Sequence, residues 1–415
     1  MFYKTFLIYF FTILFTYAQF AQELAGPSNI KSIVFKGVDK LNQFPIIFFG
    51  QSIFLEFDDL NGDEKDYYYK INYYNHDWKN SDLFKSEYID GFDNIRIENY
   101  QNSFNTLQPY THYKLELPNS NTNFKLPGNY MIEIYDELDQ LLFSRKFLIN
   151  SDTAIVSSKV FRSREMDYYD THQSIHFSIT PKSNIPFRDP ENLLKIVILK
   201  NEQWSTIKTG QKPQFISGNR LEYSYDNKSL FEGGNEYFFF DTKDIRINGN
   251  GISYVNLNRL YETYLYTNPF RKNLPYNFAS DINGDFLIRT IQGTQLSDYE
   301  ADYSWVHFSL AMPRSINEKE IYIYGKFNNY ALGEENRMIY NPSLEIYEGI
   351  LLLKQGFYNY KFIEKDSKKL SINSISGNHA LTENNYLILV YYKKFGDRYD
   401  SLVGVGKSSS FEIVD

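Results

Sequence analysis

The stretch PGNYMIEIYDE, residues 127–137, sets the pattern that organises the whole chain. A glycine is followed two residues later by a tyrosine, and apolar and polar side chains then alternate. Two later stretches repeat the arrangement, GGNEYFFFD at 233–241 and QGFYNYKFIE at 355–364. Alternation with a period of two buries one face of a β-strand, and a glycine–tyrosine lead-in to a late strand is common in two-sheet sandwiches. Three such stretches predict three β-sandwich units.

Other stretches alternate in the same way, each within reach of Gly, Asn, Asp or Pro turn signals. They are SIFLEFDDL (52–60), YYYKINYY (67–74), YKLELP (113–118), SIHFSIT (174–180), WVHFSL (305–310) and EIYIYGKF (320–327). Short strands at this spacing predict an all-β chain of tandem immunoglobulin-like or fibronectin-like β-sandwiches. A short helix is considered only for NLNRLYETYLY (256–266), where it competes with a strand.

Two polar stretches, INSDTA (149–154) and IQGTQLSDYEAD (291–302), read as junctions between units. They divide the chain into an N-terminal sandwich at 19–150, a middle sandwich at 151–295 and a C-terminal sandwich at 296–415. Because no low-complexity linker separates the units, we expect them to pack rigidly, as a rod or an arch.

The N-terminus has the layout of a secretory signal peptide. Lys4 precedes an apolar run at 6–15, and the small residue Ala18 is a suitable cleavage point. A membrane anchor is the alternative, but the run is shorter than the roughly 20 residues that span a bilayer. We therefore predict a signal peptide at 1–18 and an exported chain that does not span the membrane.

The composition indicates which classes of partner and which cellular compartment suit the chain. Formal net charge is −8, with 43 basic and 51 acidic residues, which argues against nucleic acid and anionic membrane surfaces as partners. The chain has no cysteine, so disulfides and cysteine-based metal sites are excluded. An exported chain held together without disulfides fits the bacterial periplasm. The 37 tyrosines and 35 phenylalanines are what strand-rich chains favour.

Catalytic and metal-binding signatures do not emerge from the spacing of residues. The sequence has no H-E-x-x-H, G-x-S-x-G or dinucleotide fingerprint, and its histidines show no metal-binding spacing. DINGDF (281–286) begins like a calcium loop, but Gln292 stands where the closing glutamate belongs, so a β-turn is expected. We therefore predict no catalytic residue, cofactor or metal, and keep a glycan-cleaving enzyme with two unrecognised carboxylates as a third hypothesis.

The C-terminal unit resembles a known family of sugar-binding modules. GKFNNY (325–330) and GFYNYKF (356–362) resemble the turn and strand of glycogen- and starch-binding early-set sandwiches. That resemblance implies a carbohydrate-binding-module-like sandwich with glycan contacts at Tyr330, Lys361 and Asn385. Tyr330 stands where the family has a stacking tryptophan, and the family's second tryptophan is absent.

A longer resemblance covers most of the chain. It is carried by YYKINYYNHDWKNSDL (68–83), NYQNSFNTLQPYTHYKLELPN (99–119), PGNYMIEIYDE (127–137), VILKNEQW (197–204), FEGGNEYFFFDTKDIR (231–246), DINGDF (281–286) and SGNHALTENNYLILVYYKKFGDRYDSLVG (376–404). These stretches resemble the plug proteins of the type IX secretion system of Bacteroidota.

The plug resemblance implies a non-enzymatic periplasmic protein. Its partner would be the giant outer-membrane β-barrel translocon, whose periplasmic opening the plug caps to prevent leakage when no substrate or shuttle protein is present. The residues that meet the barrel are not predicted. The alternative is a periplasmic glycan-binding protein that uses the C-terminal module.

Overall fold

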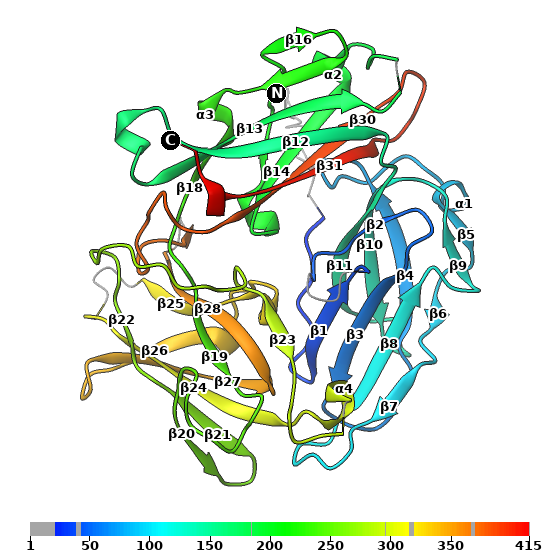
Figure 1. The fold of residues 1–415 in the computed structure, drawn as a ribbon. Coiled ribbons are helices and arrows are strands. Elements are labelled where there is room, and N and C mark those ends of the chain that lie inside the picture. Colours follow the sequence, from blue (N-terminus) through cyan, green and yellow to red (C-terminus); the bar gives the residue numbers. More distant parts are fainter. Residues whose placement is uncertain are drawn as a thin grey trace, which may run out of the picture.

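The computed structural model describes residues 21–38, 43–183, 185–294, 296–314, 319–366 and 370–414. The predicted signal peptide at 1–18 lies outside these residues. In the described part of the chain, no helix is both long and apolar enough to cross a bilayer. Figure 1 shows three β-rich bodies packed around a common centre. The prediction of an all-β fold of tandem sandwiches is confirmed.

The first body is a two-sheet sandwich. One sheet has the strand order β1-β3-β8-β7, and the other has the order β2-β11-β10-β4-β6. Tyr130 from β10 and Phe57 from β3 are fully buried in the core between them. The elements are β1 (Ile30–Lys36), β2 (Ile46–Phe48), β3 (Ile53–Asp59), β4 (Tyr68–Tyr74), α1 (Lys85–Tyr88), β5 (Ile89–Gly91), β6 (Ile95–Arg96), β7 (Tyr100–Asn102), β8 (Thr111–Leu117), β9 (Thr122–Phe124), β10 (Gly128–Tyr135) and β11 (Leu141–Asn150).

The second body also has two sheets. The order is β12-β13-β17-β16 in one, with β18 beside β13, and β15-β14-β30-β31 in the other. The elements are β12 (Ala154–Arg162), η1 (Met166–Tyr168), β13 (His172–Pro181), α2 (Pro190–Leu193), β14 (Leu194–Lys200), η2 (Trp204–Thr206), β15 (Lys208–Thr209), β16 (Phe215–Ser217), β17 (Arg220–Tyr223), α3 (Asp226–Ser229), β18 (Leu230–Glu232), β30 (Asn385–Tyr392), β31 (Ser401–Ser409) and η5 (Ser410–Glu412).

The third body is one sheet that folds over, so that its halves face each other. Its main order is β19-β28-β25-β26-β27-β24-β21-β20, and the rings of Phe240 and Phe308 meet across the core at 5.8 Å. The elements are β19 (Phe238–Asp241), β20 (Ile252–Leu257), β21 (Tyr261–Leu265), β22 (Asn268–Pro269), β23 (Phe286–Ile288), α4 (Ser297–Glu300), β24 (Tyr303–Ala311), β25 (Glu320–Tyr324), η3 (Lys326–Asn328), η4 (Glu334–Asn336), β26 (Arg337–Asn341), β27 (Ile346–Lys354), β28 (Gly356–Lys365) and β29 (Leu370–Ser371).

The segment 256–266, for which a short helix was considered, is the larger part of a β-hairpin. β20 and β21 pair antiparallel, with Tyr254 opposite Tyr264. The two rings stack at 4.2 Å, a cross-strand contact that a helix would not provide.

The sheet of β14, β30 and β31 is buried on both faces. Alternate side chains point to opposite faces of a strand: Ile198 and Ile388 enter the core of the second body, whereas Leu199 and Leu389 enter a separate core with Met131 of the first body. Burial of both faces explains why the central parts of β14 and β30 are continuous apolar runs rather than alternating ones. It also joins the first two bodies through a shared hydrophobic layer.

Beyond residue 151, strands that are far apart in the sequence pair with each other in the same sheet. β14 pairs along its whole length with β30, from Leu194 opposite Tyr392 to Lys200 opposite Tyr386. β19 in turn pairs with β28 of the third body. A boundary between residues 295 and 296 therefore cuts through two sheets, because strands from the predicted middle and C-terminal units pair with each other.

Buried polar contacts also join the bodies. The Lys354 ammonium on β27 lies 2.7 Å from the Asp58 carboxylate on β3. The Tyr391 hydroxyl on β30 donates to Asn129 Oδ1 on β10 at 2.7 Å. Gln203, which follows β14, donates to the Tyr237 hydroxyl of the third body at 2.8 Å. Each pair of bodies is thus held by at least one buried hydrogen bond or ion pair.

Candidate functional site

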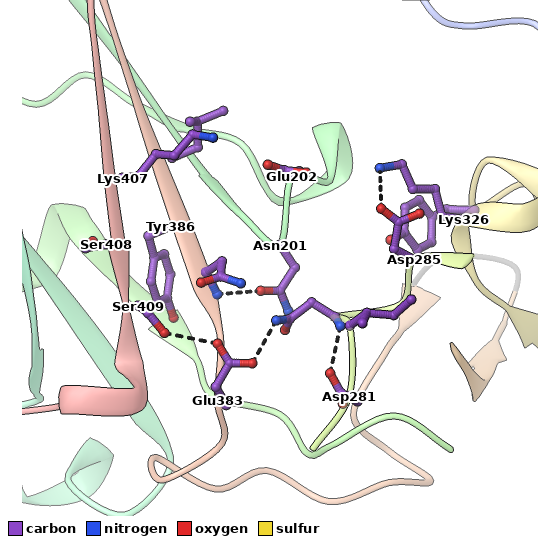
Figure 2. A pocket seen from close by; sticks show the side chains of 15 residues that line it. Asn201, Glu202, Asp281, Asp285, Lys326, Glu383, Tyr386, Lys407, Ser408 and Ser409 are labelled. Atoms are coloured by element: carbon purple, nitrogen blue, oxygen red, sulfur yellow. Dashed lines mark hydrogen bonds and ion pairs between the residues drawn. The ribbon is translucent and has the colours of Figure 1, made fainter. Parts of the chain in front are cut away.

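A polar cleft lies where the second and third bodies meet (Figure 2). Its volume is about 650 Å³. Segments that are distant in the sequence line it: 201–202 after β14, 281–285 before β23, 326–330 after β25, 383–387 at the start of β30 and 407–409 at the end of β31.

One wall of the cleft is the turn predicted in DINGDF. Asp281 holds it, because Oδ2 accepts the Tyr237 backbone N–H at 2.6 Å and Oδ1 accepts the Asn283 N–H at 2.7 Å. The Asp285 N–H closes the turn on the Ile282 carbonyl at 3.1 Å. Burial raises the pKa of the Asp281 carboxyl despite these hydrogen bonds.

A second wall is the turn GKFNNY. Asn329 and Tyr330 both adopt the left-handed conformation, with φ of 53° and 56°, and the Tyr330 N–H donates to the Gly325 carbonyl at 3.0 Å. The half-buried Tyr330 ring packs 4.9 Å from the Tyr324 ring. Lys326 pairs with Asp285 at 3.1 Å, so the two turns are tied to each other.

The third wall belongs to β30 and β31. Glu383 accepts from Asn283 Nδ2 at 2.8 Å and from Ser409 Oγ at 3.0 Å. The Asn385 backbone N–H donates to Asn201 Oδ1 at 2.8 Å, which leaves the exposed Asn385 side chain on the cleft surface. Figure 2 shows Glu383 between Ser409 and the loop that carries Asp281.

Four of the charged side chains that line the cleft, Asp281, Asp285, Lys326 and Glu383, hold its walls together. Asp281, Asp285 and Glu383 each accept the hydrogen bonds or the ion pair described above, so none of them is a free carboxylate. The rest of the lining offers a ligand amides and hydroxyls, the rings of Tyr330 and Tyr386, and the charged side chains of Glu202 and Lys407. This arrangement suits the binding of a polar ligand.

The structure brings two of the three predicted glycan contacts together. Tyr330 and Asn385 line the same cleft. Lys361 is buried on β28 and lines another cavity, where its Nζ lies 3.9 Å above the Tyr237 ring centroid. Burial, reinforced by the nearby charge of Lys200, lowers the pKa of Lys361 to about 7.

Other cleft residues were missed by sequence reasoning, including Lys326, Glu383 and Asn201. Lys326 lies inside the GKFNNY turn, so that motif contained a signal for it. Asn201 and Glu383 are separated in sequence by the entire third body, and no local pattern connects them.

Comparison with known proteins gives a family match that covers the first body. The first-domain model of the type 9 secretion system plug protein matches residues 30–151, which ends one residue after β11. Comparison with curated proteins gives no match.

The structural comparisons differ greatly in quality. The crystal structure of a hypothetical protein from Parabacteroides merdae ATCC 43184 is 32% identical, with 93% of this chain and 98% of that chain covered and a TM-score of 0.88. The B domain of a biofilm associated protein aligns over 94% of this chain and 88% of that chain, but at 9% identity and a TM-score of 0.20, so it supports no argument.

By its fold, the chain is a β protein of several sandwich-like bodies, the first two of which share a hydrophobic core. The match over the first body gives its family: the chain belongs to the type 9 secretion system plug proteins. The Parabacteroides protein, itself described only as hypothetical, shares the fold over nearly the full length.

Proposed function

We propose that this chain is a non-enzymatic plug that caps the periplasmic opening of the type IX secretion translocon barrel. It prevents leakage when neither substrate nor shuttle protein occupies the pore. The observation that carries the proposal is membership of the plug family. Export by the N-terminal signal peptide and a periplasmic position beside the outer membrane follow from the same proposal.

A plug has to be rigid, and the buried contacts between the bodies would make this chain rigid. A wide β-barrel encloses an aqueous lumen. A protein that blocks this lumen must be rigid enough to leave no gap through which solutes could diffuse. Here the first two bodies share one hydrophobic layer around Leu199 and Met131, and the first and third share the buried pair of Asp58 and Lys354. A body that is already rigid loses little conformational entropy on docking.

The proposal is tested by recovery of the barrel and by outer-membrane permeability. A C-terminally tagged chain, extracted from outer membranes in mild detergent, is expected to recover a large β-barrel subunit in stoichiometric amount. Deletion of the gene should admit a membrane-impermeant dye, and re-expression should exclude it again. Recovery of the protein without a barrel, together with unchanged dye entry on deletion, would contradict the proposal.

A periplasmic glycan-binding protein is the second candidate. It is favoured by one observation, that Tyr330 and Asn385 line the same cleft. Under this function the wild-type chain is retained on immobilised glucan, and Tyr330→Ala abolishes retention. Lys361→Met is the matched control, because Lys361 lines a different cavity. If the wild-type chain passes through every glucan column without delay, this candidate fails.

A further inference from the structure

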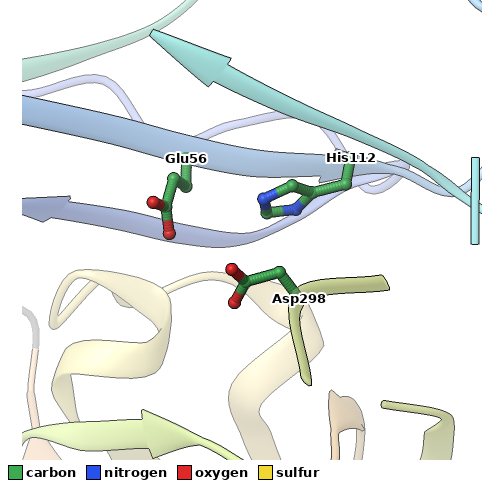
Figure 3. Close-up of side chains that lie close together, drawn as sticks. All are labelled: Glu56, His112 and Asp298. Atoms are coloured by element: carbon green, nitrogen blue, oxygen red, sulfur yellow. The ribbon is translucent and has the colours of Figure 1, made fainter. Parts of the chain in front are cut away.

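Three side chains of types that can ligate a metal ion converge between the first and third bodies. Glu56 lies on β3, His112 on β8 and Asp298 on α4. One ligand atom from each lies within 4.8 Å of those of the other two, and Figure 3 shows the three side chains directed toward a shared space. They also line a common small cavity of about 60 Å³, which is enough room for an ion with a bound water.

The orientation of His112 is fixed as it is in metal sites. Its Nδ1 lies 2.6 Å from Asp58 Oδ1. Because an ionised carboxylate can only accept, Nδ1 carries a proton, and in the neutral form of the ring the lone pair is therefore on Nε2. Ligating histidines commonly have such a carboxylate on the other ring nitrogen. Here Asp58 is held in turn by the Tyr303 hydroxyl at 2.6 Å.

The Nε2 atom of His112 has no hydrogen-bond partner among the described residues, although only 4% of the residue is exposed. A buried ring nitrogen without a partner costs free energy. In Figure 3 the outer edge of this ring faces Glu56 and lies above Asp298. An ion or a water molecule between the three side chains would satisfy it.

The lysines that now pair with Glu56 can move away when a cation binds. Glu56 is paired with Lys36 and Lys114, each at 3.1 Å. The two lysine side chains are partly exposed and long enough to turn toward solvent. Their departure would leave Glu56 and Asp298 as the anionic ligands of an incoming divalent ion, with Asp58 still neutralised by Lys354.

We propose that Glu56, His112 and Asp298 form a binding site for one divalent transition-metal ion of the zinc class. One imidazole and two carboxylates are ligands that Zn²⁺ accepts, whereas Mg²⁺ and Ca²⁺ prefer oxygen alone. Three protein ligands leave a fourth position for water. Since Glu56 and His112 belong to the first body and Asp298 to α4, the ion would fasten α4 to the first sandwich.

Metal titration of the chelator-treated full chain tests the site. Zn²⁺ followed by calorimetry is expected to bind with one ion per chain, and Co²⁺ should give the intense visible absorption of a low-coordinate site with a nitrogen ligand. His112→Gln and Asp298→Asn should each lower the affinity about 100-fold or more. Asp298→Asn keeps the test decisive if His112→Gln impairs folding, because Asp298 is only half-buried.

His379→Gln is the matched control. His379 also has a buried Nε2 without a partner among the described residues, but it lies outside the cluster, so its replacement should leave the affinity unchanged. The proposal is overturned if the folded wild-type chain binds no stoichiometric Zn²⁺, in which case water occupies the cavity. It is equally overturned if both cluster variants bind as tightly as wild type, or if Mg²⁺ competes equally for the site.

Discussion

Lys354 Nζ lies 2.7 Å from Asp58 Oδ2, and the two side chains are 1% and 0% exposed. The pair joins β27 of the third body to β3 of the first. Lys354→Met removes the cation and leaves a buried carboxylate without its charge partner. We expect a loss of about 3–5 kcal/mol in the free energy of unfolding, measured by urea denaturation at neutral pH.

The control for this prediction is an exposed ion pair in the third body. Arg337 and Glu320 lie 3.4 Å apart and their side chains are each 41% exposed, so Arg337→Met should cost less than about 1 kcal/mol. Equal, small losses in the two variants would show that the buried pair does not hold the bodies together.

Lys361 gives a prediction about pH. Its pKa in the folded chain is lowered from 10.5 to about 7, so between these values the unfolded chain binds more protons than the folded one, and stability rises with pH. Below pH 7 the full cost of burying the ammonium is present. Lys361→Met should therefore stabilise the chain by roughly 1–4 kcal/mol at pH 6, and by much less at pH 9.5.

Denaturation of both chains at the two pH values measures this difference. Lys365→Met, on the same strand but only half-buried, should change stability by no more than about 0.5 kcal/mol at either pH. If Lys361→Met changes the free energy of unfolding equally at both pH values, then packing rather than the buried charge determines the effect of the substitution.

Leu199 tests the layer that the first two bodies share. The side chain is fully buried against residues of both bodies, and Leu199→Ala should cost about 2–5 kcal/mol. Trp78 and Trp204, one from each body, touch in this layer at 4.9 Å, so tryptophan fluorescence and circular dichroism should report one common transition at lower denaturant. Leu138→Ala, at an exposed turn, is the control that should leave the midpoint in place.

Gly128 tests the lead-in to β10. Its φ is +143°, and an added Cβ would overlap the Tyr73 hydroxyl. Gly128→Ala should cost about 3 kcal/mol or more from backbone strain and overlap together, measured by thermal unfolding. Gly218 also has a positive φ, of +59°, but nothing lies within 4 Å of its added Cβ. Gly218→Ala should cost only about 1–2 kcal/mol, and an equal loss in both variants would contradict the steric argument.

The strands could be predicted from sequence because their signal is local. β10, β19 and β28 each begin at or shortly after the glycine that marks them, and their alternation follows from burial of one face. The pairing of β14 with β30 could not be predicted, because the two strands are about 190 residues apart. Each is an apolar run, and the sequence of one strand does not indicate which other strand pairs with it. A run buried on both faces indicates a middle layer, but not which layers enclose it.

The candidate sites show the same limit. Tyr330, Asn385 and Lys361 were singled out through one family resemblance. The fold places Tyr330 and Asn385 in one cleft, whereas Lys361 lines another cavity. The cluster of Glu56, His112 and Asp298 has no spacing to detect, since its members come from three distant segments. Convergence of this kind depends on how the bodies pack, and a search for motifs along the chain cannot find it.

The pairing of β14 with β30 has a consequence for biogenesis. The second body lacks half of its inner sheet until residues 385–409 have been synthesised and delivered to the compartment in which the chain folds. Until then β14 presents an unpaired apolar edge, the kind of surface that aggregates or attracts proteases. A prematurely terminated chain would therefore be removed as misfolded rather than persist as a smaller functional fragment, and only full-length molecules would reach the mature pool.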